Sequence, residues 1–361
     1  MNRIRRAAIV PGGAWGTALA VPLAANGIEV TLWQRRAEAA LAFASAHTHA
    51  HLPGVTLPPA VTATADLAAA VADADLVVLA PPSDALRAVL TRLRPLVPER
   101  TLLVSVTKGL EPESLLRMTE VIAAELPDHA HITALSGPNF AIEVARRLPT
   151  ASVVAGRDLA TAAVVQSALM TADFRVYTHH DLIGLELGGA LKNVVALAAG
   201  VAEGLNIGYN ANAALITRGL AEIARLGVAM GAHPLTFAGL AGMGDLVLTC
   251  TGTYSRNRRA GLMLGRGAPL AQVLDEVGVV EGVRTTRAAL ALSQRFHVPM
   301  PVTEQVHRIL FDHIPPRDGV MALMTRERAH ELESAGTAEG DRAMESHLSL
   351  YLRTGGKSRN R

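Results

Sequence analysis

Short aliphatic runs alternate with helical spacing of apolar residues through the first half of the chain. The runs have the length and composition of buried strands, and they cover residues 7–10, 29–33, 76–80, 102–106, 132–135, 152–155 and 174–178. Helical spacing lies between some of them, over residues 14–26, 84–93 and 114–125. Alternation of strand and helix predicts a doubly wound, mostly parallel α/β sheet with helices on both faces, over residues 1–180.

The pattern changes near Asp181, after which only helical spacing is found. The predicted helices cover residues 184–203, 213–231, 258–265, 270–277, 283–296 and 302–311. We therefore predict an all-α second domain over residues 181–330. Residues 331–361 are polar and lack a core-forming pattern, which predicts a flexible tail.

Composition limits the function classes. A chain of 361 residues that is 50% apolar is long enough for two domains, and with only 3% aromatic residues its core must be mostly aliphatic. A net charge of +2 without a long basic tract argues against a nucleic-acid partner. Because Cys250 is the single cysteine, we expect a reducing, cytoplasmic location. The sequence has no run of about 20 uncharged apolar residues, so we expect no membrane span.

The first predicted strand runs into the turn Pro11-Gly12-Gly13-Ala14-Trp15-Gly16 and then into a helix. Such a turn brings backbone N–H groups and a helix N-terminus to a pyrophosphate. Gly13 and Gly16 match the second and third glycines of the G-x-G-x-x-G fingerprint, but Pro11 stands at the first. Because proline fixes φ and lacks an N–H group, this turn must be built differently. An ordinary strand-to-helix turn remains an alternative.

The end of the second predicted strand bears on the choice of cofactor. A carboxylate usually meets the ribose of NAD about 20 residues after the glycine turn, but this strand ends Trp33-Gln34-Arg35-Arg36. Two guanidinium groups can pair with a 2′-phosphate, so the pattern predicts NADP as the preferred cofactor, with NAD possible. The alternative is that both arginines are solvated surface residues.

Several motifs occur in order along the chain. They are Gly13-Ala14-Trp15-Gly16-Thr17-Ala18-Leu19-Ala20, Thr107-Lys108-Gly109-Leu110-Glu111, Ser136-Gly137-Pro138-Asn139-Phe140-Ala141, Leu187-Gly188-Gly189-Ala190-Leu191-Lys192-Asn193, Leu215-Ile216-Thr217-Arg218-Gly219, Gly244-Asp245-Leu246-Val247-Leu248-Thr249-Cys250 and Ser255-Arg256-Asn257-Arg258-Arg259. Together they resemble the bacterial-type NAD(P)-dependent glycerol-3-phosphate dehydrogenases, over roughly residues 7–325.

The resemblance implies a Rossmann domain, a helical domain and an active site in the cleft between them. It implies reduction of dihydroxyacetone phosphate to sn-glycerol 3-phosphate by reversible hydride transfer, feeding glycerophospholipid synthesis, in a homodimer. Its implied catalytic residue is Lys192. The implied substrate-binding residues are Lys108, Gly137, Asn139, Lys192, Asp245, Ser255, Arg256 and Asn257. The implied cofactor-binding residues are Gly13, Ala14, Trp15, Gly16, Arg35, Arg36, Lys108, Ala141, Arg256, Val279 and Glu281. No metal is implied, and threonine is more usual in the family where Asn139 stands.

The residues themselves support some of these roles and leave alternatives for others. Lys192 lies among apolar residues of a predicted helix, where burial would bring its pKa toward neutrality and suit it to proton transfer; a helix-surface lysine is the alternative. Lys108 follows a strand at the edge where ligands gather. Asp245 would orient Lys192 or bind a substrate hydroxyl, and helix capping is its alternative. Ser255, Arg256 and Asn257 precede the helix predicted over 258–265, so we expect the phosphate at its start.

Two rival functions remain. A β-hydroxyacid or 6-phosphogluconate-type dehydrogenase shares the predicted layout but takes a carboxylate substrate. A catalytically silent dinucleotide-binding or regulatory protein is the other, and Pro11 in the glycine turn is its best support. His47, His49 and His51 alternate as metal ligands on a strand would, but the following Leu52-Pro53-Gly54 favours a loop.

Overall fold

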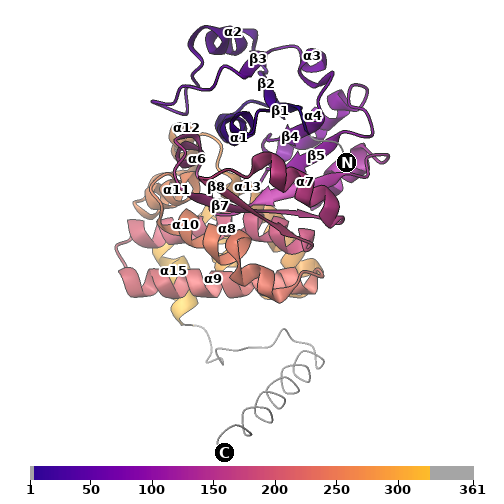
Figure 1. Cartoon of the computed structure of the whole chain (residues 1–361). Coiled ribbons are helices and arrows are strands. Elements are labelled where there is room, and N and C mark those ends of the chain that lie inside the picture. The colour runs from indigo at the N-terminus through magenta and orange to yellow at the C-terminus, as the bar shows by residue number, and fades with distance from the viewer. Residues whose placement is uncertain (1–3, 326–361) are drawn as a thin grey trace, which may run out of the picture.

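The computed structural model describes residues 4–325, and it places an eight-stranded sheet on a block of helices (Figure 1). The spatial order is β3-β2-β1-β4-β5-β6-β7-β8. All neighbouring strands are parallel except β6 and β7, so the predicted mostly parallel sheet is confirmed. The strands are β1 (Arg6–Val10), β2 (Glu29–Trp33), β3 (Val61–Thr64), β4 (Leu76–Leu79), β5 (Leu102–Ser105), β6 (Ile132–Ser136), β7 (Thr150–Gly156) and β8 (Phe174–His179).

The helices of the first half cover both faces of this sheet. They are α1 (Ala14–Ala25), α2 (Ala37–Ala46), α3 (Leu67–Val71), the short 3₁₀ helix η1 (Ser83–Ala85), α4 (Leu86–Leu93), α5 (Met118–Glu125), α6 (Ala141–Ala145) and α7 (Leu159–Leu169). Because side chains alternate along a strand, Ile9 packs in the core on one face of the sheet and Val10 in the core on the other. The alanine-rich α2 and α7 and the short, threonine-rich β3 were not predicted from the sequence.

The second half is helical in the described residues. Its elements are α8 (Leu182–Gly204), α9 (Tyr209–Ala229), the 3₁₀ helix η2 (Pro234–Ala238), the π-helix η3 (Leu240–Gly244), α10 (Asp245–Thr251), α11 (Arg256–Gly265), α12 (Leu270–Val277), α13 (Glu281–Arg295), α14 (Pro301–Phe311) and α15 (Pro316–Met324). The chain changes from sheet to helices between β8 and α8, and we propose the domain boundary at residues 180/181. The tail predicted over 331–361 lies outside the described residues.

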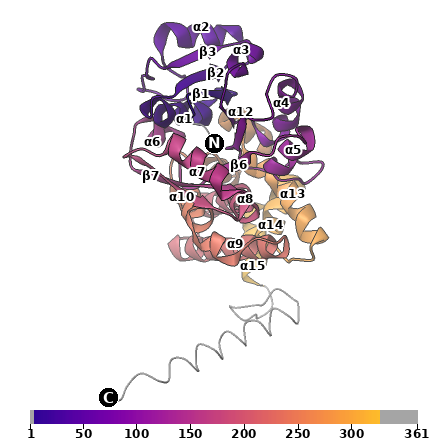
Figure 2. The ribbon, with the colours of Figure 1, turned by 45° about the vertical axis from the view of Figure 1, so that its right-hand side comes forward.

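Helix α8 is the centre of the second half, and α9, α10, α11 and α13 all pack against it (Figure 2). By length and composition it could cross a membrane, but 94% of its most apolar window is buried inside the fold. It also contacts β6 and β7. The apolar character of α8 is therefore explained by its place between the sheet and the surrounding helices.

Several helices begin elsewhere than the sequence pattern predicted, for example α9 at Tyr209 rather than at residue 213, and two of these starts have a local explanation. The helix predicted from residue 114 begins at Met118, because Ser114 Oγ accepts the Leu116 N–H (3.2 Å) and Arg117 pairs with Leu110 as an isolated antiparallel bridge. The helix predicted from residue 258 begins at Arg256, because the hydroxyl of Ser255 accepts the Arg258 N–H (3.1 Å) and caps the helix.

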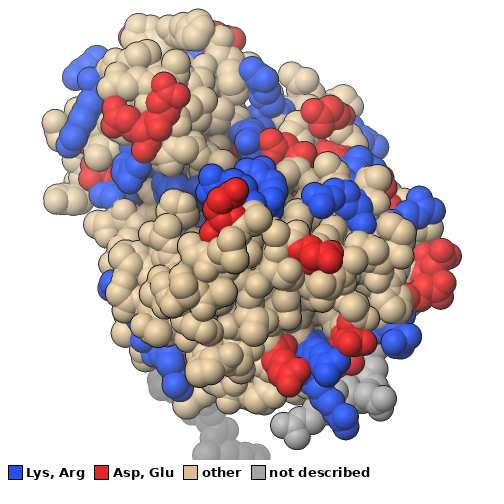
Figure 3. All heavy atoms as spheres, turned by 90° about the horizontal axis from the view of Figure 1, so that it is seen from above, with Lys and Arg blue, Asp and Glu red and all other residues tan. Residues whose placement is uncertain are grey.

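The strand order places β1 between β2 and β4, so the loops after β1 and β4 diverge at the carboxyl edge of the sheet. In doubly wound sheets this is the place where ligands bind. Lys and Arg side chains gather near the middle of the face seen in Figure 3, with Asp and Glu side chains beside them. The visible face thus carries mixed charge rather than one continuous basic tract.

Glu222 gives a stability prediction for the helical half. This buried side chain on α9 accepts the N–H groups of Val302 (2.7 Å) and Thr303 (3.3 Å) at the start of α14. Burial raises its pKa from 4.5 to about 7. The folded chain thus binds this proton more tightly than the unfolded chain, and the resulting stabilisation is lost as the pH rises from 4.5 through about 7.

We therefore expect Glu222→Gln to gain stability relative to the parent chain across this pH range, by at most about 3 kcal/mol. Urea unfolding at a series of pH values measures the difference. Glu29→Gln, which changes a carboxylate that is 72% exposed, is the control and should show no such trend. A Glu222→Gln difference that does not vary with pH would contradict the assignment.

Candidate active site

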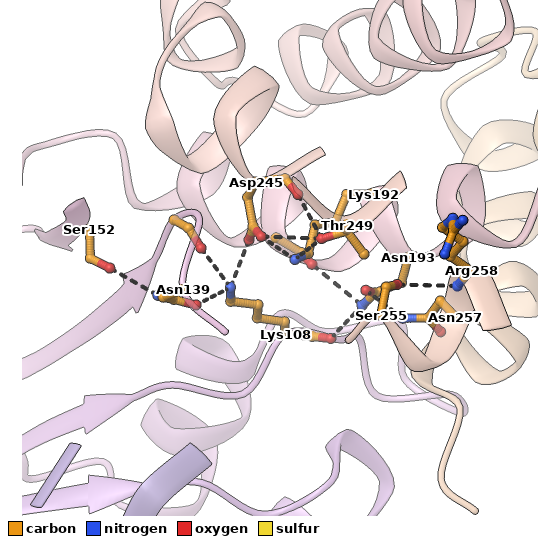
Figure 4. A network of polar contacts seen from close by, with 12 residues as sticks. Lys108, Asn139, Ser152, Lys192, Asn193, Asp245, Thr249, Ser255, Asn257 and Arg258 are labelled. Carbon is orange, nitrogen blue, oxygen red and sulfur yellow. Dashed lines mark hydrogen bonds and ion pairs between the residues drawn. The ribbon is translucent and has the colours of Figure 1, made fainter. Parts of the chain in front are cut away.

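Lys108 connects the sheet to the helical half. It follows β5 at the carboxyl edge of the sheet, and its Nζ donates to three oxygens: Gly137 O (2.9 Å), Asn139 Oδ1 (2.7 Å) and Asp245 Oδ2 (2.7 Å) (Figure 4). Asp245 begins α10, whereas the other two residues follow β6. The ammonium group therefore lies where the two halves of the molecule meet.

Lys192 approaches the same carboxylate from α8. Its Nζ donates to Asp245 Oδ1 and to Thr249 Oγ1, the latter at 2.7 Å. Thr249 lies one turn after Asp245 on α10, and its hydroxyl donates to Asp245 O (2.6 Å). Only 5% of Lys192 is exposed, so the helix-surface alternative for this lysine is wrong.

Asp245 is shared between the two lysines. Its side chain is 1% exposed, and it makes no capping hydrogen bond to the backbone of α10, so the helix-capping alternative is wrong as well. One carboxylate faces two amines that both carry a positive charge when protonated. The protonated cluster is then positive by one charge, which suits an anionic ligand or a developing oxyanion.

The electrostatics of Lys192 favour proton exchange near neutrality. Burial lowers its pKa from 10.5 to about 7 because the charged form loses water. Asp245 opposes this shift by attraction, while the nearby Lys108 ammonium adds to it by repulsion. A lysine with such a pKa can act as a general acid or base at physiological pH.

Gly137 and Asn139 shape the side of the site next to the sheet. Gly137 has φ +140°, and a Cβ there would lie 3.0 Å from Ser152 Cα, so a side chain would be strained and crowded. Asn139 donates from Nδ2 to Ser152 Oγ (2.9 Å), which directs its Oδ1 toward Lys108. Asn139 thus links Ser152 of β7 to Lys108 by two defined hydrogen bonds.

The residues predicted at the start of α11 connect to the lysine cluster through Asn193. Asn257 Nδ2 donates to Asn193 Oδ1 (2.9 Å), and Asn193 Nδ2 donates to Lys108 O (3.1 Å). Ser255 caps α11, and Arg256 is its exposed first residue. Contrary to the prediction that they precede the helix, Arg256 and Asn257 therefore lie in its first turn, where backbone N–H groups favour anions.

The turn after β1 fits a dinucleotide pyrophosphate. The first intrahelical bond of α1 joins Thr17 N to Gly13 O (2.8 Å), so the N–H groups of the preceding turn have no partner within the helix. A Cβ on Gly13 would meet no atom within 4 Å, whereas one on Gly16 would lie 2.6 Å from Ile9 Cγ2. Gly16 therefore allows α1 to pack on the strand, and Gly13 leaves space in front of the turn. Pro11 takes part in the turn, because Gly13 N donates to Pro11 O (2.9 Å), and Gly12 N ties the turn to β2 through Trp33 O (2.8 Å).

The remaining predicted cofactor residues lie on several elements of both halves. Arg35 and Arg36 are exposed after β2, next to Gln34, whose Nε2 donates to Gly12 O (3.0 Å). Ala141 begins α6, and Val279 is half-buried just before α13. Glu281 begins α13 and accepts from the hydroxyl of Ser83 (2.8 Å), the first residue of η1, and burial raises the pKa of Glu281.

Sequence reasoning assigned no role to Thr249, Asn193 or Ser152. The first two lie within quoted motifs, and the spacing of Thr249 four residues after Asp245 would have placed both on one helix face. Ser152 carried no such signal, because its contact with Asn139 depends on how β7 returns antiparallel beside β6.

Comparison with known proteins identifies the family of this chain. Residues 6–162 match the family model described as NAD-dependent glycerol-3-phosphate dehydrogenase N-terminus, and residues 181–321 match the corresponding C-terminus. The chain belongs to this glycerol-3-phosphate dehydrogenase family. The resemblance stated from the motifs is thereby confirmed.

Similar members of the glycerol-3-phosphate dehydrogenase family cover nearly the whole chain. A protein from Symbiobacterium thermophilum, named glycerol-3-phosphate dehydrogenase (NAD(P)+), is 54% identical over 92% of this chain and 97% of its own length. A protein of the same name from Bacillus subtilis is 47% identical over 91% of this chain and 97% of its own length. The crystal structure of a glycerol-3-phosphate dehydrogenase from Coxiella burnetii is 39% identical, with a TM-score of 0.85 over 90% of this chain and 99% of that chain.

The shared carboxylate gives the prediction for this site. We expect Asp245→Asn to lower the free energy of unfolding by about 3 kcal/mol, because it leaves buried amines without a counter-charge. Urea denaturation measures the loss. Asp245→Asn combined with Lys192→Met should lose less than the sum of the two single variants, and strict additivity would contradict direct pairing.

Proposed function

We propose that this protein reduces dihydroxyacetone phosphate to sn-glycerol 3-phosphate, reversibly, with NADPH preferred and NADH also used. The observation that carries the proposal is the buried cluster in which Lys192 and Lys108 share Asp245 at the meeting point of sheet and helices. The product feeds glycerophospholipid synthesis. The relatives carry a name that covers both cofactors.

The two lysines have different roles at the reacting carbonyl. A bound nicotinamide supplies the hydride at C2 when it is present. Lys192, the proposed catalytic residue, donates a proton to the C2 oxygen, and Asp245 keeps its ammonium oriented. Lys108 contributes a second positive charge beside the developing oxyanion. Gly137 and Asn139 hold Lys108 in place and border the substrate.

We place the substrate phosphate at the start of α11. Arg256 offers a guanidinium group there, while Ser255 and Asn257 fix the first turn of the helix. Helix N-termini and guanidinium groups are both suited to bind phosphate dianions. Because Asn257 is tied to Asn193 next to Lys192, this placement puts the phosphate close to the proton donor.

The dinucleotide is placed along the carboxyl edge of the sheet. Its pyrophosphate lies at residues 13–16 and the start of α1, and Arg35 and Arg36 flank the ribose end. Ala141, Val279, Glu281, Lys108 and Arg256 border the nicotinamide end. We further propose a cytoplasmic homodimer that acts on a small molecule.

The rival functions predict different behaviour. A hydroxyacid dehydrogenase would turn over carboxylate substrates, and a silent binding protein would bind dinucleotide without turnover. The retention of Lys108, Lys192 and Asp245 in one hydrogen-bonded cluster favours an active dehydrogenase over the silent protein.

The direct test follows NADPH oxidation in the presence of dihydroxyacetone phosphate. We expect turnover only with this substrate and a loss of at least about 100-fold in kcat for Lys192→Ala. Because the protonated amine is the acid in the reduction, kcat should fall as the pH rises through about 7, and the reverse oxidation should rise over the same range. Unchanged turnover in Lys192→Ala would sink the mechanism.

Cofactor choice is tested by replacing both arginines after β2. We expect Arg35→Gln with Arg36→Gln to raise the KM for NADPH about tenfold, the effect of losing roughly 1.5 kcal/mol of charge-assisted hydrogen bonding. The KM for NADH should stay nearly constant. Arg157→Gln, an exposed arginine after β7, is the matched control. Equal effects on both cofactors would remove the basis for NADP preference.

A further inference from the structure

A segment of the first half leaves the sheet and packs against the helical half. Residues 108–117, here named the strap, run from the site lysine Lys108 to the residue before α5. The strap folds back on itself, since Leu110 pairs with Arg117 and Glu111 N donates to Leu116 O (3.0 Å). One end of the strap therefore lies in the active site, and the other end starts a helix of the sheet domain.

Helix α8 holds the strap at its first end. Asn193 Nδ2 donates to Lys108 O (3.1 Å), so the backbone that carries the site lysine is attached to the helix that carries Lys192. Between the two ends, the Leu110 side chain is 1% exposed and packs in the helical core together with Leu187 and Leu191 of α8.

Glu186 of α8 holds the second end. Its carboxylate accepts from Arg117 Nη1 (2.5 Å), Thr119 N (2.8 Å) and Thr119 Oγ1 (2.6 Å). The side chains of Glu186 and Arg117 are 4% and 7% exposed. This carboxylate thus caps α5 of the sheet domain from a helix of the other domain, and none of the proposed chemistry uses it.

The two residues of α8 that hold the strap are separated by close to a whole number of helical turns. Glu186 and Asn193 are seven residues apart, which is about two turns, so they lie on the same face of α8. Lys192 directly precedes Asn193, the residue that holds the first end of the strap. On its outer side the strap is held to the sheet domain, where Arg87 Nη2 donates to Glu111 Oε2 (2.7 Å).

We propose that the Arg117–Glu186 pair is a clamp that fixes the strap on α8 and thereby sets the position of Lys108 against Asp245 and Lys192. Glu186 and Arg117 are then positioning residues that act through Lys108, some distance along the chain from the reacting atoms. The kinetic consequence rests on the proposed function, whereas the mechanical clamp does not.

The test compares Glu186→Gln with the parent chain by hydrogen exchange and by kinetics. We expect faster exchange of the amides in residues 108–117, because the clamp loses its charge. We expect kcat to fall roughly tenfold through misplacement of Lys108. The apparent pKa in the kcat–pH profile should rise, since Lys192 would keep the attraction of Asp245 and feel less repulsion from Lys108.

Glu222→Gln is the matched control, because Glu222 is also a buried carboxylate that caps a neighbouring helix, but within the helical half. It should leave strap exchange and the pH profile unchanged. Arg117→Lys should give intermediate strap exchange, and it takes the place of Glu186→Gln if that variant does not fold. In a Lys108→Ala background, Glu186→Gln should no longer shift the pH profile.

Unchanged strap exchange in Glu186→Gln, or equal changes in Glu222→Gln, would overturn the clamp. Faster strap exchange with an unaltered kcat and pH profile would overturn its catalytic role. If the parent chain itself fails to turn over dihydroxyacetone phosphate, the proposed function fails, and hydrogen exchange alone still decides whether the clamp exists.

Discussion

The site depends on one carboxylate that is shared by two amines. Asp245 is almost completely buried, and burying it alone would be costly; it is stabilised because Lys108 and Lys192 donate to its two oxygens. The same pairing keeps a buried lysine partly charged although burial favours its neutral form. The cluster is therefore an electrostatic link between the two halves of the molecule, and it contains the proposed proton donor Lys192.

The architecture follows from the need to bring these groups together. The sheet supplies Lys108 at its carboxyl edge, whereas Lys192 and Asp245 come from α8 and α10 of the helical half (Figure 4). Neither half contains the cluster by itself. The buried α8 contacts both β6 and the helices around it, and so joins the two halves beside the cluster.

Much of the fold and several site residues could be predicted from the sequence, and the features that could not be predicted have physical reasons. Buried strands such as β4 and β5 were found because a short aliphatic run bounded by turn signals is typical of a buried strand. The start of α5 was misplaced because Leu110 and Arg117 pair through backbone groups, which leave no trace in residue type. Ordered motifs indicated Lys108, Lys192 and Asp245, but their shared hydrogen bonds depend on tertiary packing. Ser152 and Glu186 were missed for the same reason, since each acts on a residue distant in the chain.

A charge argument links the cluster to the class of substrate. With both amines protonated, two positive charges face one negative charge, and the excess is balanced when an oxyanion forms at the carbonyl. A substrate that carries a carboxylate beside the reacting carbon would satisfy the excess already in the ground state, which gives binding without selective acceleration. In the proposed placement, the phosphate binds to groups on α11 rather than to the two lysines, which leaves the excess charge available for the transition state. Because the proposed phosphate ligands on α11 are residues other than the two lysines, this arrangement favours a phosphorylated ketone over a keto acid.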